Sequence, residues 1–331
     1  MINEKAKIFL SFLIRFGISA LLLFYLFSKI DIGKFAGILK AADPVYIFYA
    51  FLFFLLSNAV ILYRWLIFIR ALELDSPLED VIRYFFIGLF GNLFLPSGVG
   101  GDLIKAMGLC KSSSRKARVI ASVVLDRLSG FAAVIIVSVI VYVLGYRLIG
   151  AHFLLIPIMM LAGISLTLAL ILFNEKIFSF VSDVFKRIPK IKDALMKLHY
   201  DISLIRHQRA RGYLAVGLSC LTQVLSAATL FFISKAVHQD IGIIYFLVFT
   251  PMICVASSLP SLGGLGVRDW GARELFGRIG VDSGIAVSFT LINYLFMVLI
   301  GILGGVVYVI TVSSGRLQHH SPDPGIVPKN P

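Results

Sequence analysis

Charged residues are scarce in this sequence. Asp, Glu, Lys and Arg make up 15% of its 331 residues, whereas hydrophobic residues make up 59%. A water-soluble domain of this size needs more polar surface, so the composition excludes a soluble globular protein. Apolar runs recur along the chain, and a run of about 20 residues crosses the hydrocarbon core of a bilayer as a helix. The sequence therefore predicts an all-α polytopic membrane protein.

The sequence also has few cysteines and lacks two motifs of common enzymes. The three cysteines, Cys110, Cys220 and Cys254, are too few for a disulfide framework. The chain has no GxxxxGK[ST] loop and no His-Glu-x-x-His motif, and its histidines are scattered. We therefore expect no cofactor and no metal site. The net charge of +13 suits an anionic membrane surface better than nucleic acid, so we expect no nucleic-acid partner.

About eight hydrophobic segments can be drawn along the chain, and two of them are unusual. The third and the seventh end in a proline followed by a glycine cluster, a composition that cannot continue a helix. We expect one transmembrane domain, 1–312, with halves of about 1–147 and 148–312, and a disordered polar tail at 313–331. The segments are 10–30, 44–70, 81–96, 119–144, 148–173, 212–236, 241–260 and 283–312.

The distribution of basic residues predicts an orientation. Both the loop at 105–118 and the amphipathic helices expected within 175–208 carry more Lys and Arg than Asp and Glu, so both belong on the cytoplasmic side of a plasma (inner) membrane, near anionic lipids. We expect the amphipathic helices to lie on the membrane surface. With both termini cytoplasmic, the third segment must enter and leave on one face, and the seventh must do so on the opposite face. A plain eight-span bundle is the alternative.

The two unusual segments resemble each other. The stretch from Asn92 to Asp102 and the stretch from Ser258 to Asp269 both read Leu-Pro-Ser, then glycines, then Asp. Interrupted helices in corresponding places of two halves are typical of transporters built as inverted repeats. The fold class that we predict is therefore all-α with two re-entrant or broken helices in an inverted-repeat arrangement.

Such a tip has specific chemistry. Proline ends the first half-helix, glycines let the backbone approach a ligand, and the next helix begins with N–H groups that favour an anion. A lipid phosphate is the obvious anion in a bilayer. Lys105 and Arg268 stand near the starts of the two returning helices and are expected to assist. Asp102 and Asp269 are expected to cap those helices, and capping without any substrate role is equally consistent with the sequence.

Three charged residues in or near the predicted spans need partners. Arg127 lies well inside the fourth segment, where a charge costs about 2.5–3.5 kcal/mol on insertion scales unless something offsets it. Arg64 either has a partner or reaches the interface beside Trp65. Glu274 has Arg127, Arg278 or solvent as its candidates, and the sequence does not choose among them.

These motifs resemble those of the lysylphosphatidylglycerol synthase transmembrane region, also called the flippase-like domain family. The likeness extends from the first segment to about Val312. It rests on Asn-x-x-x-Pro-x-x-x-Gly-Gly-Asp at 92–102, Asp-Arg-Leu at 126–128 and Pro-x-x-Gly-Gly-x-Gly-x-Arg-Asp at 260–269. Lys105 stands where the family often has arginine, which keeps the charge but loses the bidentate grip. Asp269 replaces the usual glutamate and shortens its reach.

The resemblance implies a role in moving lipids between leaflets. The multidomain relatives also carry a soluble C-terminal aminoacyl-transfer domain, and here only a short tail follows the last segment, so we expect the transport module without transferase activity. Two alternatives stay open. One is a membrane-embedded lipid-modifying transferase, and the other is a small-solute carrier or a scaffold for a partner enzyme. The sequence leaves the lipid, the energy source and the oligomeric state open.

We expect the substrate, a lipid headgroup with its phosphate, to bind at the two glycine-rich tips and at the buried arginine. The expected binding residues are Asn92, Pro96, Gly100, Gly101, Asp102, Lys105, Arg127, Pro260, Gly263, Gly264, Gly266, Arg268 and Asp269.

Overall fold

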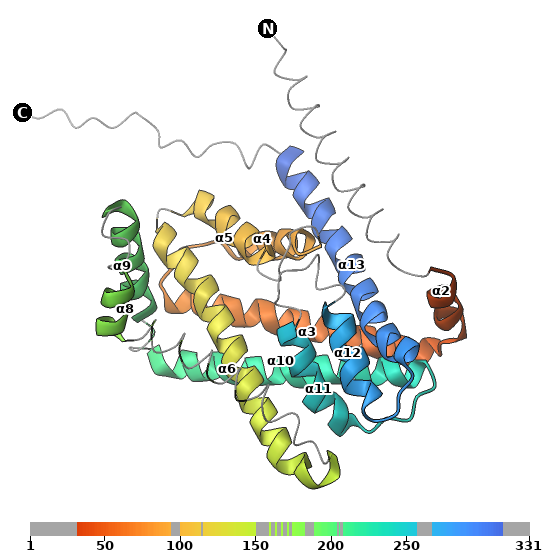
Figure 1. Ribbon diagram of the computed structural model, residues 1–331. Helices are drawn as coiled ribbons and strands as arrows, with labels where there is room; N and C mark the ends of the chain where they lie inside the picture. Colours follow the sequence, from red (N-terminus) through yellow and green to blue (C-terminus); the bar gives the residue numbers. More distant parts are fainter. Residues whose placement is uncertain are drawn as a thin grey trace, which may run out of the picture.

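The described part of the chain is a bundle of α-helices without strands (Figure 1). In this computed structural model the described residues are 32–93, 100–113, 115–149, 159, 163, 167, 171, 174–182, 189–203, 205, 208–256 and 267–313. The predicted all-α membrane fold is confirmed. The expected segment at 10–30 and most of the one at 148–173 lie outside the described residues.

Four of the described helices contain stretches that are long and apolar enough to cross a membrane. They are α3 (Pro44–Ala71), α6 (Lys116–Ile149), α10 (Arg209–Ala236) and α13 (Ser283–Ser313). The shorter helices are α2 (Ile32–Ala41), α4 (Leu78–Gly91), α5 (Gly100–Ser112), α8 (Glu175–Ser182), α9 (Pro189–Ser203), α11 (Ile243–Ala256) and α12 (Val267–Gly277).

Local sequence fixes the ends of the long helices. Asp43 caps α3 by accepting a 2.8 Å hydrogen bond from the Val45 N–H, and Pro44 occupies the first turn, where its missing N–H is not needed. Asp282 caps α13 in the same way, accepting from the N–H groups of Gly284 at 2.8 Å and Ile285 at 3.2 Å. These caps satisfy backbone donors that have no partner within the helix.

The helices α4 and α5 form a hairpin that leaves and re-enters the bundle at one end. After α3, the chain turns into α4, and the carbonyl oxygens of that turn accept hydrogen bonds from Arg115, in the loop after α5, and from Arg118, in the first turn of α6. Arg118 donates to the Leu72 carbonyl, and Arg115 donates to the Glu73 carbonyl, both at 3.0 Å. At the same end Arg211, at the start of α10, donates to the Arg70 carbonyl at 2.8 Å.

A second hairpin, α11 with α12, opens at the opposite end of the bundle. There the start of α3 meets the end of α10, since the Asp43 N–H donates to the Ala236 carbonyl at 2.9 Å. Side chains just before α11 and just after α12 pack into one apolar cluster at this end, which includes Leu39, Val237, Ile241, Ile279 and Val281. The two hairpins therefore enter the bundle from opposite ends.

Glycines in α13 allow the first hairpin to pack closely. A Cβ atom at Gly304 would overlap the carbonyl oxygen of Phe86 in α4, and one at Gly305 would lie 2.9 Å from the Phe90 ring. Small residues of this kind let helix backbones approach each other in membrane proteins, where packing replaces the hydrophobic effect between helices. The other half of α13 packs against α12, so α13 contacts both hairpins.

The amphipathic segment forms two helices, α8 and α9, and Pro189 begins the second one. The C-terminal end of this segment packs against the bundle. Ile202 is fully buried and Ile205 is 8% exposed, and both pack into the cluster around Trp65. Arg118 of α6 also forms an ion pair with Asp201 of α9 at 3.3 Å. The apolar side chains at this end thus cover the protein core instead of lipid.

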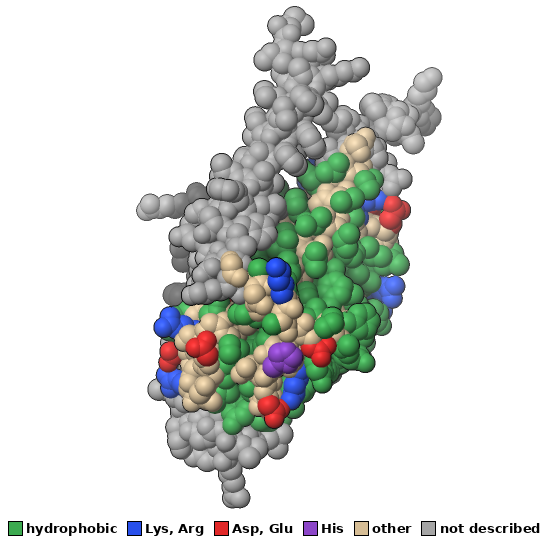
Figure 2. Space-filling model, turned by 90° about the vertical axis from the view of Figure 1, so that its right-hand side faces the viewer, with side chains coloured by type: hydrophobic (Ala, Val, Ile, Leu, Met, Phe, Trp, Pro, Cys, Tyr) green, Lys and Arg blue, Asp and Glu red, His purple; other side chains and the backbone are tan. Residues whose placement is uncertain are grey.

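The outer surface is largely apolar. Figure 2 views the molecule from the side on which α2 lies in Figure 1, and it shows a continuous run of hydrophobic side chains with charged groups standing singly or in small sets. Along α3, large apolar side chains point outward, among them Val45 at 57% and Phe48 at 63% exposure. A surface of this extent is unfavourable in water and suits lipid.

Candidate functional site

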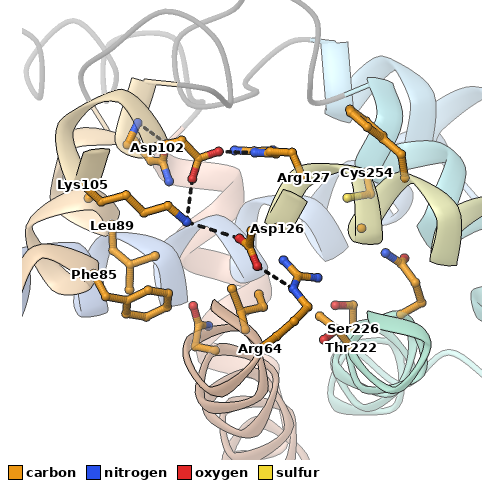
Figure 3. Close-up of a pocket in the computed structure, with 18 of the residues that line it drawn as sticks. Arg64, Phe85, Leu89, Asp102, Lys105, Asp126, Arg127, Thr222, Ser226 and Cys254 are labelled. Carbon is orange, nitrogen blue, oxygen red and sulfur yellow. Dashed lines mark hydrogen bonds and ion pairs between the residues drawn. The ribbon is translucent and has the colours of Figure 1, made fainter. Parts of the chain in front are cut away.

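A polar cavity lies inside the bundle, where the first hairpin meets the long helices (Figure 3). Its volume is about 250 Å³, and its walls come from α3, α4, α5, α6, α10 and α11, together with Asn92 after α4. The side chains that line it include Asn58, Arg64, Asn92, Asp102, Lys105, Asp126, Arg127, Thr222, Gln223, Ser226 and Cys254.

Asp126 of α6 is the centre of the charges in this cavity. Its Oδ1 accepts a 2.7 Å hydrogen bond from Nε of Arg64 in α3, and its Oδ2 accepts a 3.3 Å hydrogen bond from Nζ of Lys105 in α5. The three side chains are 4%, 9% and 5% exposed, respectively. Both carboxylate oxygens are thus engaged by cations, which offsets the large unfavourable free energy of burying each charge alone.

Asp102 of α5 extends the series toward the cavity opening. Lys105 lies 2.9 Å from its Oδ1, and Nε of Arg127 donates a hydrogen bond to its Oδ2. The Arg127 side chain is 36% exposed, so this end of the series is the accessible one. Charges alternate in the order Arg64, Asp126, Lys105, Asp102 and Arg127, and Figure 3 shows this chain of contacts.

Neutral groups hold the buried cations in place. Besides its contact with Asp126, Arg64 donates a 2.9 Å hydrogen bond from Nη1 to the Ser219 hydroxyl of α10. That hydroxyl in turn donates to Ser129 Oγ at 3.2 Å. The ammonium group of Lys105 lies 4.7 Å from the centre of the Trp65 ring. A cation over an indole face is attracted by the negative face of the ring. Helices α3, α5, α6 and α10 are therefore linked through one network.

The glycine-rich segment places Lys105 by bringing two backbones together. The Gly101 N–H donates a 2.8 Å hydrogen bond to Oδ1 of Asn92, which satisfies one donor at the start of α5. A Cβ atom at Gly88 would lie 2.8 Å from the Gly101 carbonyl oxygen, and a Cβ atom at Gly101 would overlap the Gly88 carbonyl oxygen and the Asn92 side chain. Only glycine permits this approach of α4 and α5.

One sequence interpretation needs correction, and the structure decides between the two alternatives for Arg64. Asp102 does not cap α5, because its two oxygens bind Lys105 and Arg127, and Asn92 accepts the Gly101 N–H instead. Arg64 does not reach the interface, because its side chain is 9% exposed and binds Asp126. Of the candidate partners of Glu274, the structure has Arg278, whose guanidinium lies 2.9 Å away, and solvent, because the glutamate side chain is 48% exposed.

The second hairpin brings a different buried arginine. Arg268 in the first turn of α12 is 5% exposed, and its guanidinium lies 5.2 Å from the Tyr294 ring of α13. Its Nε and one terminal nitrogen have no hydrogen-bond partner among the described residues, and Asp269 is 3.9 Å from Nε. Asp269 itself accepts a 2.6 Å hydrogen bond from the Thr290 hydroxyl. The arginine thus retains hydrogen-bonding capacity within the described fold.

The predicted site residues divide into three groups. The lining of the cavity includes Asn92, Gly101, Asp102, Lys105 and Arg127. Gly100 begins α5 and does not line the cavity. Arg268 and Asp269 lie in α12, which belongs to the second hairpin. The other helix of that hairpin, α11, contributes Cys254 to the cavity wall. The remaining predicted residues, Pro96, Pro260, Gly263, Gly264 and Gly266, lie outside the described residues.

Sequence reasoning did not assign Arg64 and Asp126 to the site, although both are central to it. The available signal was their position inside apolar segments, because two opposite charges at membrane depth usually pair. Gln223, Thr222 and Asn58 also line the cavity, and the Oε1 atom of Gln223 has no hydrogen-bond partner among the described residues. Pairings between helices far apart in the chain leave no local pattern, so the sequence alone did not reveal them.

The chain is similar to known membrane proteins over most of its length. The profile of the family described as "Lysylphosphatidylglycerol synthase TM region" matches residues 12–305. A UPF0104 membrane protein of Pyrococcus horikoshii is 25% identical over 325 residues, which cover 89% of this chain and 95% of the relative. A UPF0104 membrane protein of Methanothermobacter thermautotrophicus is 23% identical over 286 residues, which cover 80% of this chain and 84% of the relative. No solved structure matches the chain. With nearly the whole chain matched by the family's profile, the protein belongs to the lysylphosphatidylglycerol synthase transmembrane-region family.

Proposed function

We propose that this protein moves an anionic phospholipid, or another lipid-linked phosphate, between the two leaflets of the membrane. The observation that supports this function is the cavity lined by Arg64, Lys105 and Arg127, which lies among membrane-spanning helices. Buried basic residues are unfavourable in a membrane interior, and they are usually found where a substrate or ion passes. Membership of the family is consistent with a lipid-related role.

In this proposal the two hairpins are re-entrant and form an inverted repeat. Each consists of two helices of 11 to 14 residues, too short to span a hydrocarbon core of about 30 Å. They open at opposite ends of the bundle, as the turn at Leu72 and the cluster around Ile241 indicate. The helices α5 and α12 would then begin within the membrane and direct the positive ends of their dipoles toward a headgroup.

The basic end of the bundle is assigned to the cytoplasm of a plasma (inner) membrane. Lys111, Arg115 and Lys116 are exposed there, next to Arg209 and Arg211 at the start of α10. Basic residues near the ends of spans favour the cytoplasmic side, and they attract anionic lipids of that leaflet. This placement puts the opening of the first hairpin on the cytoplasmic face and that of the second on the outer face.

The headgroup would bind the cations of the cavity, and the lipid tails would stay outside it. Arg127 is the accessible cation of the cavity, and Lys105 lies behind Asp102. The acyl or isoprenoid chains would remain in the lipid around the bundle, whose outer surface is apolar. Rocking of the two halves about the cavity would then expose the headgroup to each leaflet in turn.

A vesicle assay tests this function directly. The purified protein is reconstituted with phosphatidylglycerol that carries a nitrobenzoxadiazole label on one acyl chain, and dithionite is added outside to bleach the outer leaflet. Transport moves the labelled lipid outward from the inner leaflet, so the protected fraction should fall in vesicles that contain the protein. The Arg127→Ala and Lys105→Ala variants should keep most of the label protected, since each loses a cation that would bind the phosphate.

Arg278→Ala is the matched control, because this arginine forms an exposed pair with Glu274 in the second hairpin and does not line the cavity. It should transport like the parent. If the parent protein, folded and inserted, leaves the inner-leaflet label protected for phosphatidylglycerol and for a polyprenyl phosphate alike, lipid transport is ruled out. If both cavity variants transport like the parent, the function stands but the cavity is not its route.

A further inference from the structure

The charges that line the cavity do not cancel. Arg64, Lys105 and Arg127 supply three positive charges, and Asp102 and Asp126 supply two negative ones, which leaves an excess of one positive charge. Each of the five side chains contacts an oppositely charged one, so all five are counted as ionised.

This excess matters because the surroundings are apolar. Phe85, Leu89 and Ile61 also line the cavity, and three of the four candidate membrane spans, α3, α6 and α10, form part of its wall. A net charge enclosed by hydrocarbon and protein is far less stable than a neutral assembly, since little water is there to screen it. The cavity with its occupant should therefore be most stable when the occupant carries one negative charge.

The two carboxylates differ in how they affect an occupant. Asp126 lies at the buried end, and both of its oxygens already bind cations, Arg64 and Lys105. Asp102 lies at the accessible end and shares the partly exposed Arg127 with any anion that enters. A second negative charge on the occupant would meet Asp102, which is also negative and is held beside Arg127.

We infer that the cavity accepts a headgroup with a single negative charge, a phosphate diester, and that Asp102 sets this limit. The inference rests on the proposed function and specifies the charge of the lipid that the cavity holds. A phosphate monoester or a diphosphate carries two or more negative charges and is disfavoured, and a zwitterionic headgroup leaves the excess positive charge unbalanced. Asp102 acts here as a specificity-determining residue.

Substitutions by neutral residues of similar size change the net charge of the cavity without adding bulk. Asp102→Asn leaves three positive charges against one negative and should shift the preference to a dianion. Arg127→Gln leaves two against two and should remove the preference for an anion over a zwitterion. The double variant Asp102→Asn, Arg127→Gln leaves two against one, the same excess as the parent, and should restore the preference for a monoanion.

The test is a binding ranking of three lipids by native mass spectrometry of the full-length protein in detergent at pH 9. Phosphatidylcholine has no net charge and phosphatidylglycerol has one negative charge. Phosphatidic acid is a phosphate monoester that has lost its second proton at this pH, so it has two. The parent should bind phosphatidylglycerol at least about tenfold more tightly than the other two, since one uncompensated charge at low dielectric is worth at least a factor of ten. Asp102→Asn should place phosphatidic acid first. Asp240→Asn, in an exposed pair with Lys235, is the matched control and should rank the lipids as the parent does.

The outcomes separate this inference from the proposed function. If the parent ranks phosphatidic acid first, or if Asp102→Asn keeps the parent's ranking, the charge limit is wrong even though anionic lipids bind. The lipid ranking is measured on the parent protein as well, so the inference can still be contradicted if a variant fails to fold. If no anionic lipid binds more tightly than phosphatidylcholine, the proposed function fails as well.

Diethyl phosphate, a soluble diester, is added as a competitor. If diethyl phosphate displaces phosphatidylglycerol at the concentration at which the lipid itself binds, the charge limit is supported. The substrate would then be a soluble phosphate diester and not a lipid.

Discussion

Arg64 and Asp126 lie 62 residues apart in the chain and meet inside the bundle, where Nε of the arginine donates a 2.7 Å hydrogen bond to Oδ1 of the aspartate. Lys105 binds the other oxygen of Asp126 at 3.3 Å. One carboxylate therefore joins α3, α5 and α6, and it does so where the side chains are at most 9% exposed. The position of the first hairpin relative to the long helices depends on this carboxylate.

Replacing Asp126 by Asn should destabilise the fold strongly. The change leaves Arg64 and Lys105 facing a neutral group, and a buried charge that loses its partner typically costs about 3–5 kcal/mol. We expect the free energy of unfolding, measured by denaturant titration in detergent, to fall by about that amount. The double variant Arg64→Met, Asp126→Leu removes both buried charges and should recover most of the loss, with Lys105 still held by Asp102. A double variant no more stable than Asp126→Asn would contradict this account.

The same contacts show how much could be predicted from the sequence. Composition and segment length were sufficient for the all-α membrane fold, because the bilayer requires long apolar helices. The Pro and Gly clusters predicted interruptions after the third and seventh segments. The structure describes α4 to Gly91 and α11 to Ala256, and both prolines lie outside the described residues. The contacts of Arg64 with Asp126 and of Asp102 with Arg127 were not predicted, because they depend on how helices distant in the sequence pack. The capping role expected of Asp102 follows from local rules. An ion pair with Lys105 in the same helix and a tertiary one with Arg127 of α6 replaced it.

Gly304→Ala should weaken the packing of the first hairpin against α13. The added methyl group would overlap the Phe86 carbonyl oxygen and lie 3.2 Å from Cβ of Phe90, so one of the two helices must move. Overpacking of this kind costs about 1–3 kcal/mol, and we expect the thermal denaturation midpoint in detergent to drop accordingly. Gly217→Ala in α10 is the matched control, because a Cβ atom there meets nothing within 4 Å, and it should be neutral or slightly stabilising.

Asn92→Ala should loosen the first turn of α5 without unfolding the protein. The substitution removes the acceptor of the Gly101 N–H, and losing such a cap typically costs about 1 kcal/mol. Hydrogen exchange followed by mass spectrometry should show faster exchange in the peptide that contains Gly101 and Asp102, with unchanged exchange in α10. Asn92→Asp keeps the acceptor and should protect the turn like the parent. Equal exchange in the alanine variant and the parent would show that Asn92 is dispensable as a cap.

Arg268 and Arg64 are both buried arginines, but their surroundings differ. Arg64 is hydrogen-bonded to Asp126 and Ser219. Arg268 has two nitrogen atoms with no hydrogen-bond partner among the described residues. Its favourable contacts are a long ion pair with Asp269, at 3.9 Å from Nε, and the Tyr294 ring at 5.2 Å. A group kept in a costly environment without structural benefit is typical of a functional position.

Substituting methionine for each arginine should therefore have opposite effects on stability. Arg64→Met removes two hydrogen bonds of a buried cation and should lower the free energy of unfolding by about 3 kcal/mol. Arg268→Met removes unsatisfied donors, whose burial costs about 1–3 kcal/mol. It loses the contact with Tyr294 and the long ion pair with Asp269, which keeps its hydrogen bond from Thr290, so stability should rise by about 1 kcal/mol. The same Arg268→Met variant should show reduced transport of labelled phosphatidylglycerol in vesicles, because the arginine would assist the headgroup at the second hairpin. A variant that is more stable and transports normally would remove Arg268 from the transport route, and one that is less stable would show that the arginine serves the fold.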